Sequence, residues 1–369
     1  MIFLHRFAFI VLIFSALFAL TTATAFASGA TWTQRTSAGH LVWDGISSSA
    51  DGLKLAAVAQ GTSTDYFAYD YIYTSTDGGV TWTQRTSAGQ RDWVDIQLTP
   101  DGNTLVAVAY ADAPDNFNPD YIYTSTDGGV TWTQRTGAGA HYWCDAAISS
   151  DGTHIAASPC NDVSGNPDYI YTSTDGGVTW TQRTGTGAHF WDAIASSTDG
   201  TKLIAAAKGP DYIYTSTDGG VTWTQRTSAG QRSWEDVASS ADGTKLVALS
   251  AHPGASSNPD YIYTSTDGGV TWTQQTGAGL AFWDSVGSSG DGSKLVVDAF
   301  CNTLPCVSDN AAIYTSIDGG TTWIQQTNAG YRNWEDIAIT PDGTKVVAAS
   351  ANDNAAIRTT STPPLSLLR

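Results

Sequence analysis

Asp70-Tyr-Ile-Tyr-Thr-Ser-Thr-Asp-Gly-Gly-Val-Thr-Trp-Thr-Gln-Arg-Thr86 is the stretch that decides the fold. Residues 71–75 form a short aromatic and β-branched run typical of a strand, and residues 81–86 form a second such run. Residues 76–79 between them predict a tight turn, because Asp caps a turn with its carboxylate and glycine adopts positive φ at little steric cost. The stretch therefore predicts a β-hairpin.

This hairpin recurs along the chain, and tryptophans mark its period. Near-identical copies begin at Asp120, Asp168, Asp211 and Asp260, and an altered copy runs from Ala311 to Thr327. One tryptophan lies in each hairpin, and a second, called here the inner tryptophan, follows eleven residues later. The hairpin set is Trp32, Trp82, Trp132, Trp180, Trp223, Trp272 and Trp323, and the inner set is Trp43, Trp93, Trp143, Trp191, Trp234, Trp283 and Trp334. Seven pairs predict seven units.

Each unit reads as four strands. The first starts at the inner tryptophan, as in residues 93–98; an Asp-Gly turn follows at Asp101, and residues 105–109 form a small, apolar second strand. A loop of variable length then leads into the hairpin. Four strands in about 40 to 50 residues are typical of a propeller blade. We therefore predict an all-β fold, a seven-bladed β-propeller of four-stranded antiparallel blades.

The two ends of the repeat array complement each other. Residues 30–36 match a fourth strand without a blade of its own, and residues 355–360 match a third strand that no fourth strand follows. We expect the N-terminal strand to pair with the C-terminal three, because this closure removes an open sheet edge. The predicted domains are a propeller over residues 28–360 and a tail over residues 361–369.

The first 27 residues predict a signal peptide. His5 and Arg6 precede an apolar run over residues 7–20, and Ala25-Phe-Ala27 has the small-x-small form of a cleavage site. The run is too short for a membrane span, and no other apolar run is long enough. We expect a secreted or cell-envelope protein with no transmembrane segment after signal removal.

Composition narrows the range of partners. A net charge of −18 argues against nucleic acid, whose phosphates need a basic surface, and against anionic membranes. No cofactor or metal is predicted, and a monomer is expected. The four cysteines form two local pairs, Cys144 with Cys160 and Cys301 with Cys306. Export favours disulfides for both pairs; a zinc site is the alternative, but no paired His/Cys spacing supports it.

Ser75, Asp77, Gly79, Thr81 and Trp82 fit the pattern Ser-x-Asp-x-Gly-x-Thr-Trp, which resembles the Asp-box, or bacterial neuraminidase repeat. The aspartates of its six copies are Asp77, Asp127, Asp175, Asp218, Asp267 and Asp318. The resemblance covers the mature chain and implies a β-propeller of the superfamily that holds sialidases, xyloglucan-active hydrolases, sortilin-type receptors and photosystem II assembly factors. In that superfamily the box is a structural turn.

Chain topology predicts two different faces. The Asp-Gly turns and the hairpin turns lie on one, called here the turn face. The linkers between blades and the loops between second and third strands lie on the other, called here the linker face. These loops vary most, from residues 208–210 to residues 111–119 and 300–310. Variable loops on a rigid scaffold usually carry binding, so we expect the site on the linker face.

The inner tryptophans are expected to ring the channel mouth on the linker face, each followed by a carboxylate at one or two residues. These carboxylates are Asp44, Asp95, Asp145, Asp192, Glu235 with Asp236, Asp284, and Glu335 with Asp336. Aromatic faces beside carboxylates suit sugars. The alternative is that each tryptophan packs between blades and each carboxylate fixes the linker backbone. Repetition in every blade favours this structural interpretation.

Residues that break the symmetry are candidate site residues. Arg91, Arg232 and Arg332, two residues before an inner tryptophan, could clamp an anion. Solvated linker residues that offset nearby aspartates are the alternative. The three arginines match the sialidase arginine triad in number only, because the Arg-Ile-Pro motif of that family is absent. His141 and His189 occupy the same position and are expected to be incidental.

Three functions remain open at this stage, and one of them is a structural surface protein with no small ligand. The leading hypothesis is an exported, non-catalytic binding propeller that recognises glycan or protein through its linker face, with the inner tryptophans and the three arginines as ligand-binding residues. The alternative is a glycoside hydrolase, sialidase-like or other, with two carboxylates as acid and base. The candidates for that pair are Glu235, Glu335, Asp236 and Asp336.

Overall fold

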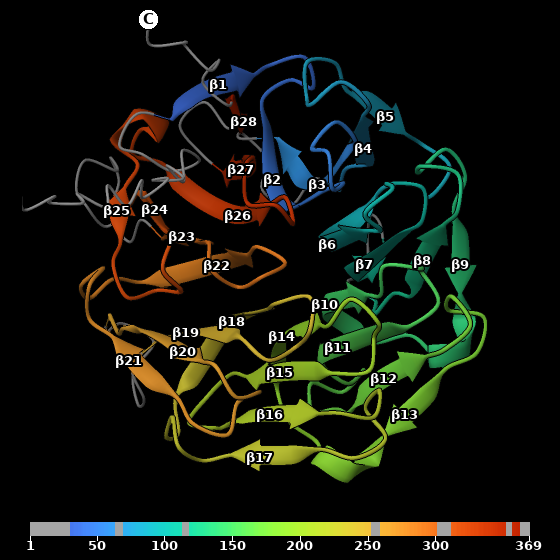
Figure 1. Cartoon of the computed structure of the whole chain (residues 1–369). Helices are drawn as coiled ribbons and strands as arrows, with labels where there is room; N and C mark the ends of the chain where they lie inside the picture. The colour runs from blue at the N-terminus through green and yellow to red at the C-terminus, as the bar shows by residue number, and fades with distance from the viewer. Residues whose placement is uncertain are drawn as a thin grey trace, which may run out of the picture.

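Seven four-stranded antiparallel sheets surround a central axis, as Figure 1 shows, which confirms the predicted seven-bladed β-propeller. The computed structural model describes residues 30–62, 69–112, 118–251, 259–300, 311–351 and 356–361. The predicted signal peptide, Cys301, Cys306 and residues 362–369 lie outside them. No helix in the described ranges is long and apolar enough to cross a membrane.

The strands follow one order in every blade, from the channel outward. Blade 1 holds β2 (Leu41–Ser48), β3 (Leu55–Thr62), β4 (Ile72–Ser75) and β5 (Thr83–Arg85). Blades 2 to 4 hold β6 (Arg91–Leu98), β7 (Leu105–Asp112), β8 (Ile122–Ser125) and β9 (Thr133–Arg135); β10 (Tyr142–Ile148), β11 (Ile155–Asn161), β12 (Ile170–Ser173) and β13 (Thr181–Arg183); and β14 (Trp191–Ser196), β15 (Leu203–Ala207), β16 (Ile213–Ser216) and β17 (Thr224–Arg226).

The same order continues to the seam. Blades 5 to 7 hold β18 (Ser233–Ser239), β19 (Leu246–Ala251), β20 (Ile262–Ser265) and β21 (Thr273–Gln275); β22 (Trp283–Ser288), β23 (Leu295–Ala299), β24 (Ile313–Ser316) and β25 (Ile324–Gln325); and β26 (Asn333–Ile339), β27 (Val346–Ala351), β28 (Ile357–Ser361) and β1 (Thr31–Arg35). Short 3₁₀ turns lie in some linkers: η1 (Thr136–Ala138), η2 (Thr184–Thr186) and η4 (Thr327–Ala329).

Blade 7 is built from both ends of the chain, as predicted. Strand β1 pairs antiparallel with β28, in a register that runs from Thr31 opposite Ser361 to Arg35 opposite Ile357. Trp32 packs against the inner tryptophan Trp334, with ring centroids 6.4 Å apart. Hydrogen bonds and apolar contacts therefore close the seam together, and β1 covers the edge of β28.

Hydrogen bonds inside each hairpin turn explain why its sequence hardly varies. In the first copy, Asp77 Oδ1 accepts from the backbone N–H of Thr81 at 2.9 Å, and Oδ2 accepts from the Thr81 hydroxyl at 2.6 Å. These bonds, the side-chain one first, lower the pKa of Asp77 to about 2. Gly79 adopts a φ of 81°, which side chains rarely tolerate. The turn is thus specified by its own residues.

Contacts between turns establish the turn face. The backbone N–H of Gly78, in the hairpin turn, donates to the carbonyl of Leu53, in the Asp-Gly turn, at 2.8 Å. Five lysines then join neighbouring blades on this face by donating to a carbonyl of the next Asp-Gly turn. They are Lys54, Lys202, Lys245, Lys294 and Lys345. Because Lys345 reaches Asp51, this series also spans the seam.

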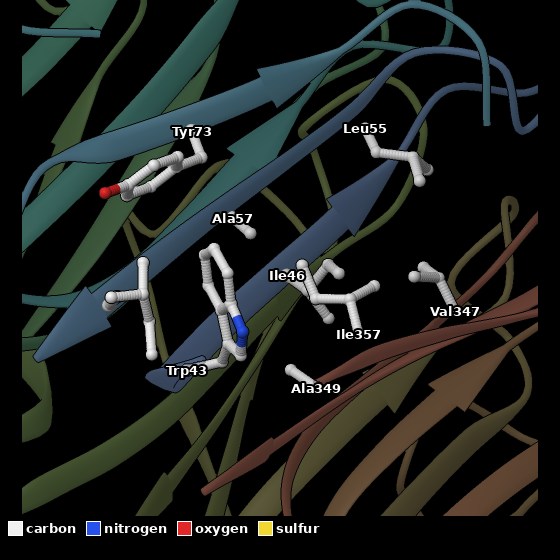
Figure 2. Packing of buried hydrophobic residues seen from close by; sticks show 10 residues of the cluster. Trp43, Ile46, Leu55, Ala57, Tyr73, Val347, Ala349 and Ile357 are labelled. Atoms are coloured by element: carbon white, nitrogen blue, oxygen red, sulfur yellow. The ribbon is translucent and has the colours of Figure 1, made fainter. Parts of the chain in front are cut away.

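Each interface between blades contains an apolar cluster around an inner tryptophan. Figure 2 shows Trp43 beside Tyr73 of its own blade and across from Val347, Ala349 and Ile357 of blade 7. Every inner tryptophan is at most 2% exposed. This burial fits the structural interpretation of these residues. Their indole faces point into protein and are not presented to a sugar in this structure.

Trp43→Ala is expected to lower the free energy of unfolding by about 3–5 kcal/mol, because it removes a large side chain from a packed interface. The hairpin tryptophan Trp82 is only partly buried, so Trp82→Ala should cost about 1–2 kcal/mol. Urea unfolding followed by circular dichroism measures both. Equal losses for the two variants would contradict this account of the core.

Candidate functional site at the channel mouth

A cavity of about 530 Å³ runs between the seven inner strands. Its two ends differ in chemistry because each inner strand begins at the linker face and ends at the turn face. Carboxylates near the strand starts line the linker end, whereas residues such as Ser48, Leu98 and Pro341 line the turn end. The linker end is called here the mouth.

One set of mouth carboxylates holds neighbouring blades together. These residues stand two positions after an inner tryptophan, and each accepts from a backbone N–H of the next inner strand. The bonds are Ala146 N to Asp95 Oδ2 at 3.2 Å, Ile194 N to Asp145 Oδ2 at 2.6 Å, Val286 N to Asp236 Oδ2 at 2.7 Å, and Ile46 N to Asp336 Oδ2 at 2.6 Å. They are called here the tie carboxylates.

The other blades show why this position is structural. Ser285 replaces a tie carboxylate in blade 6, and its hydroxyl accepts from Ile337 N at 3.2 Å and donates to Asp336 Oδ1 at 2.8 Å. Gly45 occupies the position in blade 1, where a Cβ would lie 2.9 Å from the carbonyl oxygen of Val94. The residue type at this position is therefore determined by the need to bond the backbone of the next blade and by the space that the next blade leaves.

A second set of carboxylates stands one residue after the inner tryptophan and lines the mouth without bonding to the next backbone. Its members come from five successive blades, 4 to 7 and then 1: Asp192, Glu235, Asp284, Glu335 and Asp44. They are called here the carboxylate arc. Val94 and Cys144 occupy this position in blades 2 and 3, so the arc is open on one side.

Crowding keeps part of the arc protonated near neutral pH. Burial, followed by the charges of neighbouring carboxylates, raises the pKa of Asp284 to about 7. Burial also raises the pKa of Asp192 to about 7, although Lys208 opposes the shift. The pKa of Glu335 lies well above its ordinary value, from burial and then from Asp284, Asp44 and Asp298. Ionising every carboxyl at the mouth at once therefore costs free energy, because the charges are buried and close to one another.

Exposed apolar side chains lie on the linker face near the arc. Phe190 and Tyr331, in the linkers before Asp192 and Glu335, are 43% and 38% exposed, and Leu280, in the linker before Asp284, is 51% exposed. The carbonyl of Phe190 accepts from Lys208 N at 2.7 Å, which fixes this linker beside the short loop of blade 4. Apolar and acidic groups thus occur together on this face.

The arginines predicted to bind an anion are engaged within the protein. Arg91 Nη1 lies 2.7 Å from Asp120 Oδ2, and its guanidinium stacks 4.6 Å from the ring of Tyr123. Arg232 pairs with Asp260 at 2.7 Å in the same way. The backbone N–H of Arg332 donates to the carbonyl of Ala311. The three arginines belong to blades 2, 5 and 7, and the guanidinium groups of Arg91 and Arg232 are already paired with a carboxylate of their own blade.

His141 and His189 take the place of arginine in blades 3 and 4 and are not incidental. His189 Nδ1 lies 2.5 Å from Asp211 Oδ2, and Nε2 lies 2.9 Å from the carbonyl of Thr186. The ring of His141 makes the same two contacts, with Asp168 and Ala138. At His189, only an imidazolium can donate to the carboxylate and to the carbonyl at once. Burial opposes the charge on His189, but the bonds to Asp211 and Thr186 raise its pKa overall.

The sequence contained a signal for these pairs. An aspartate stands two residues before the third strand in blades 1 to 5, and an arginine or histidine stands two residues before the inner tryptophan in blades 2 to 5. The strand pattern did not reveal that the aspartate and the basic side chain of the same blade are in contact. Among the four candidate catalytic residues, Asp236 and Asp336 are tie carboxylates, whereas Glu235 and Glu335 belong to the arc.

The carboxylates of the mouth are not arranged as the ligands of a metal ion. Among the described residues, no group of three or more His, Cys, Asp or Glu side chains is placed to hold one. The disulfide Cys144–Cys160 is present, as predicted, and Cys144 lines the mouth on the side where the arc is open.

No family model matches the chain, and no curated protein is similar to it in sequence. Solved structures match the fold. YCF48 from Cyanidioschyzon merolae aligns with a TM-score of 0.60 at 14% identity, over 89% of this chain and 98% of that one. A structure described as YCF48 bound to D1 peptide aligns with a TM-score of 0.62 at 14% identity, over 90% and 97%.

A third structure, an ancestral GH74 enzyme, aligns with a TM-score of 0.64 at 16% identity. The match covers 89% of this chain and 46% of the enzyme. At these identities the likeness establishes a shared propeller fold and nothing more specific. One neighbour is a peptide-bound protein and another is an enzyme, so the fold alone does not choose between the two functions.

Stability is expected to fall as pH rises above 6.5, the ordinary pKa of histidine, through the raised pKa of His189 in the folded state. Below that window the imidazolium supplies both hydrogen bonds. His189→Ala should therefore cost about 1–2 kcal/mol at pH 6, and less at pH 9.

Arg91 and Arg232 provide the matched control for this prediction, because they occupy the same position in blades 2 and 5. His189→Arg should keep the pair with Asp211 charged at all pH values and flatten this part of the profile. Thermal unfolding between pH 5.5 and 9 measures the effect. A His189→Arg profile as steep as that of the parent chain would show that His189 does not carry the dependence.

Proposed function

We propose that this chain is an exported, non-catalytic binding propeller that recognises a polypeptide through its linker face. The observation that carries the proposal is the open mouth, which is lined by the carboxylate arc and lies on the same face as the variable loops. A rigid ring with variable loops at one end is a common scaffold for recognition. The signal-like sequence of residues 1–27 and the disulfide Cys144–Cys160 support export.

Three features favour a polypeptide over a glycan. The inner tryptophans are buried and leave no indole face for a sugar. Exposed apolar side chains, including Phe190 and Tyr331, lie beside the acidic mouth, and such mixed surfaces suit peptide side chains. A structure that shares the fold is described as bound to a peptide.

A glycoside hydrolase is the second candidate, and the protonation of the mouth favours it. A general acid needs a carboxyl that holds its proton near neutral pH, and Asp192 and Asp284 have pKa values of about 7. The likeness to a GH74 enzyme gives this candidate a further basis. Against it, Asp236 and Asp336 are occupied by backbone N–H groups of the next blade.

Peptides selected from a display library against the mature chain are expected to bind the linker face. Phe190→Ala and Tyr331→Ala should each weaken such peptides about tenfold, because exposed aromatic side chains often anchor interfaces. Val178→Ala and Val221→Ala are matched controls, since these valines are about 60% exposed in hairpin turns on the opposite face. Isothermal titration calorimetry with each selected peptide measures the affinities.

Other outcomes would replace this proposal. Peptides weakened by the valine variants and not by the aromatic ones would move the site to the turn face. Binding on a glycan array, without binding of any peptide, would establish a glycan ligand. Turnover of chromogenic glycosides that is abolished by Glu335→Gln or Glu235→Gln would establish the hydrolase.

A further inference from the structure

Two neighbouring cavities lie on the turn face, one on each side of blade 5. The first, of about 240 Å³, lies between blades 4 and 5, and the second, of about 300 Å³, lies between blades 5 and 6. Leu246, the first residue of β19, lines both of them. Turn residues such as Gly243 and Gly268 line the first cavity, and Gly292 and Gly319 line the second. The two cavities together are called here the blade-5 groove.

The fold does not require an open space at this position. The equivalent space between blades 3 and 4 measures only about 10 Å³, and His154 stands there in place of Lys202. A comparable space, of about 260 Å³, occurs at the seam between blades 7 and 1. Protein interiors are otherwise packed with few voids. The groove is therefore a property of particular blade boundaries and not a gap that every pair of blades leaves.

Arg226 lines the first cavity with a guanidinium that is anchored at one nitrogen. Its Nε donates to Thr215 Oγ1 at 2.7 Å. Its stem packs on the hairpin turn of blade 5, where a Cβ on Gly269 would lie 3.6 Å from Arg226 Cγ. Within the described residues the side chain makes no other hydrogen bond. The two Nη groups therefore remain as donors whose position is already fixed by the protein.

Hydroxyl and aliphatic groups make up most of the remaining lining. Thr217 in the first cavity and Thr273 in the second are exposed hydroxyl residues. Leu246 contributes an apolar wall to both cavities, and Val270, which is 55% exposed, lines the first. Hydroxyls both donate and accept hydrogen bonds. A sugar ring presents the same combination, with hydroxyls around its edge and C–H groups on its faces.

The charges in the groove favour a neutral ligand. Lys202 and Lys245 are engaged by the protein, because their ammonium groups donate to carbonyls of the next Asp-Gly turn at 2.6 and 2.7 Å. Asp267 lines the first cavity together with Arg226, and Asp318 lines the second. A polyanion that followed the groove would therefore meet a carboxylate in each cavity, and like charges repel.

We propose that the blade-5 groove binds a neutral oligosaccharide, with one sugar ring in each cavity and the chain crossing Leu246. In the first cavity the Nη groups of Arg226 donate to sugar hydroxyls, and Leu246 and Val270 contact C–H groups. Each cavity is at or below the lower end of the range for drug-sized ligands, which suits a single ring. The groove lies on the face opposite the mouth, so this site goes beyond the proposed function and does not depend on it.

The test uses the mature chain and three neutral hexasaccharides, cellohexaose, maltohexaose and β-1,4-mannohexaose. Hexagalacturonate is the anionic comparison. Calorimetry at pH 7 is expected to show at least one neutral hexasaccharide binding with a Kd of about 1 mM or lower. The methyl glycoside of the same sugar should bind about tenfold more weakly, because it fills one cavity only.

Two variants test the first cavity, each with a matched control. Val270→Trp fills the cavity from its exposed edge, and Arg226→Gln removes the free donors; each should weaken the hexasaccharide about fivefold. Gln275 holds the arginine position in blade 5 and bonds to the third strand in the same way, so Arg226→Gln keeps a native contact. Val221→Trp and Arg183→Gln are the same substitutions beside the closed space between blades 3 and 4, and should leave the affinity unchanged.

Each variant is compared after circular dichroism shows that it is folded. Failure of all three neutral hexasaccharides to bind at about 10 mM would overturn the proposal, and tighter binding of hexagalacturonate than of any of them would overturn the neutral ligand. Equal losses in the variants and their controls would exclude the groove. A loss with Phe190→Ala and not with Val270→Trp would place the sugar at the mouth. Absence of peptide binding to the linker face would overturn the proposed function and leave this site standing.

Discussion

The constraint on which this structure depends is the backbone of the seven inner strands. Each inner strand pairs on one side only, so its other edge has N–H groups that face the channel or the next blade. The tie carboxylates satisfy a set of these groups, as when Asp145 accepts from Ile194 N at 2.6 Å. Closing the ring therefore brings acceptors to the channel, and in four blades these acceptors are carboxylates.

The same residue type does opposite work at the two ends of the propeller. On the turn face, Asp77 is partly exposed to water and accepts three hydrogen bonds, which lower its pKa to about 2. In the channel, burial raises the pKa of Asp336 to about 7 even though it accepts backbone bonds. Desolvation determines the direction of the aspartate pKa shift in the channel, and hydrogen bonding determines it in the turns. Acid should therefore weaken the turns, whereas rising pH should weaken the channel wall.

The sequence was sufficient for the architecture because the repeat is regular. The tryptophan spacing gave the number of blades, and the unpaired strands at residues 30–36 and 355–360 gave the seam, which β1 and β28 form as expected. The site was harder to predict, because the two kinds of mouth carboxylate differ by one residue. A register shift follows each inner tryptophan, as between Trp234 and Val237. This local irregularity separates Glu235 from Asp236 and has no marker in the sequence.

Blades 2 and 3 share two departures from the repeat, and one of them changes the lining of the mouth. Val94 and Cys144 interrupt the carboxylate arc there, and Thr104 and His154 replace the lysines that join blades on the turn face. The blades still fold, so these changes are compatible with the ring. Their effect is to confine the carboxylate arc to five blades, while blades 2 and 3 still contribute the tie carboxylates Asp95 and Asp145 to the lining. A ring of seven equal blades would present no preferred direction, whereas this mouth differs from one side to the other.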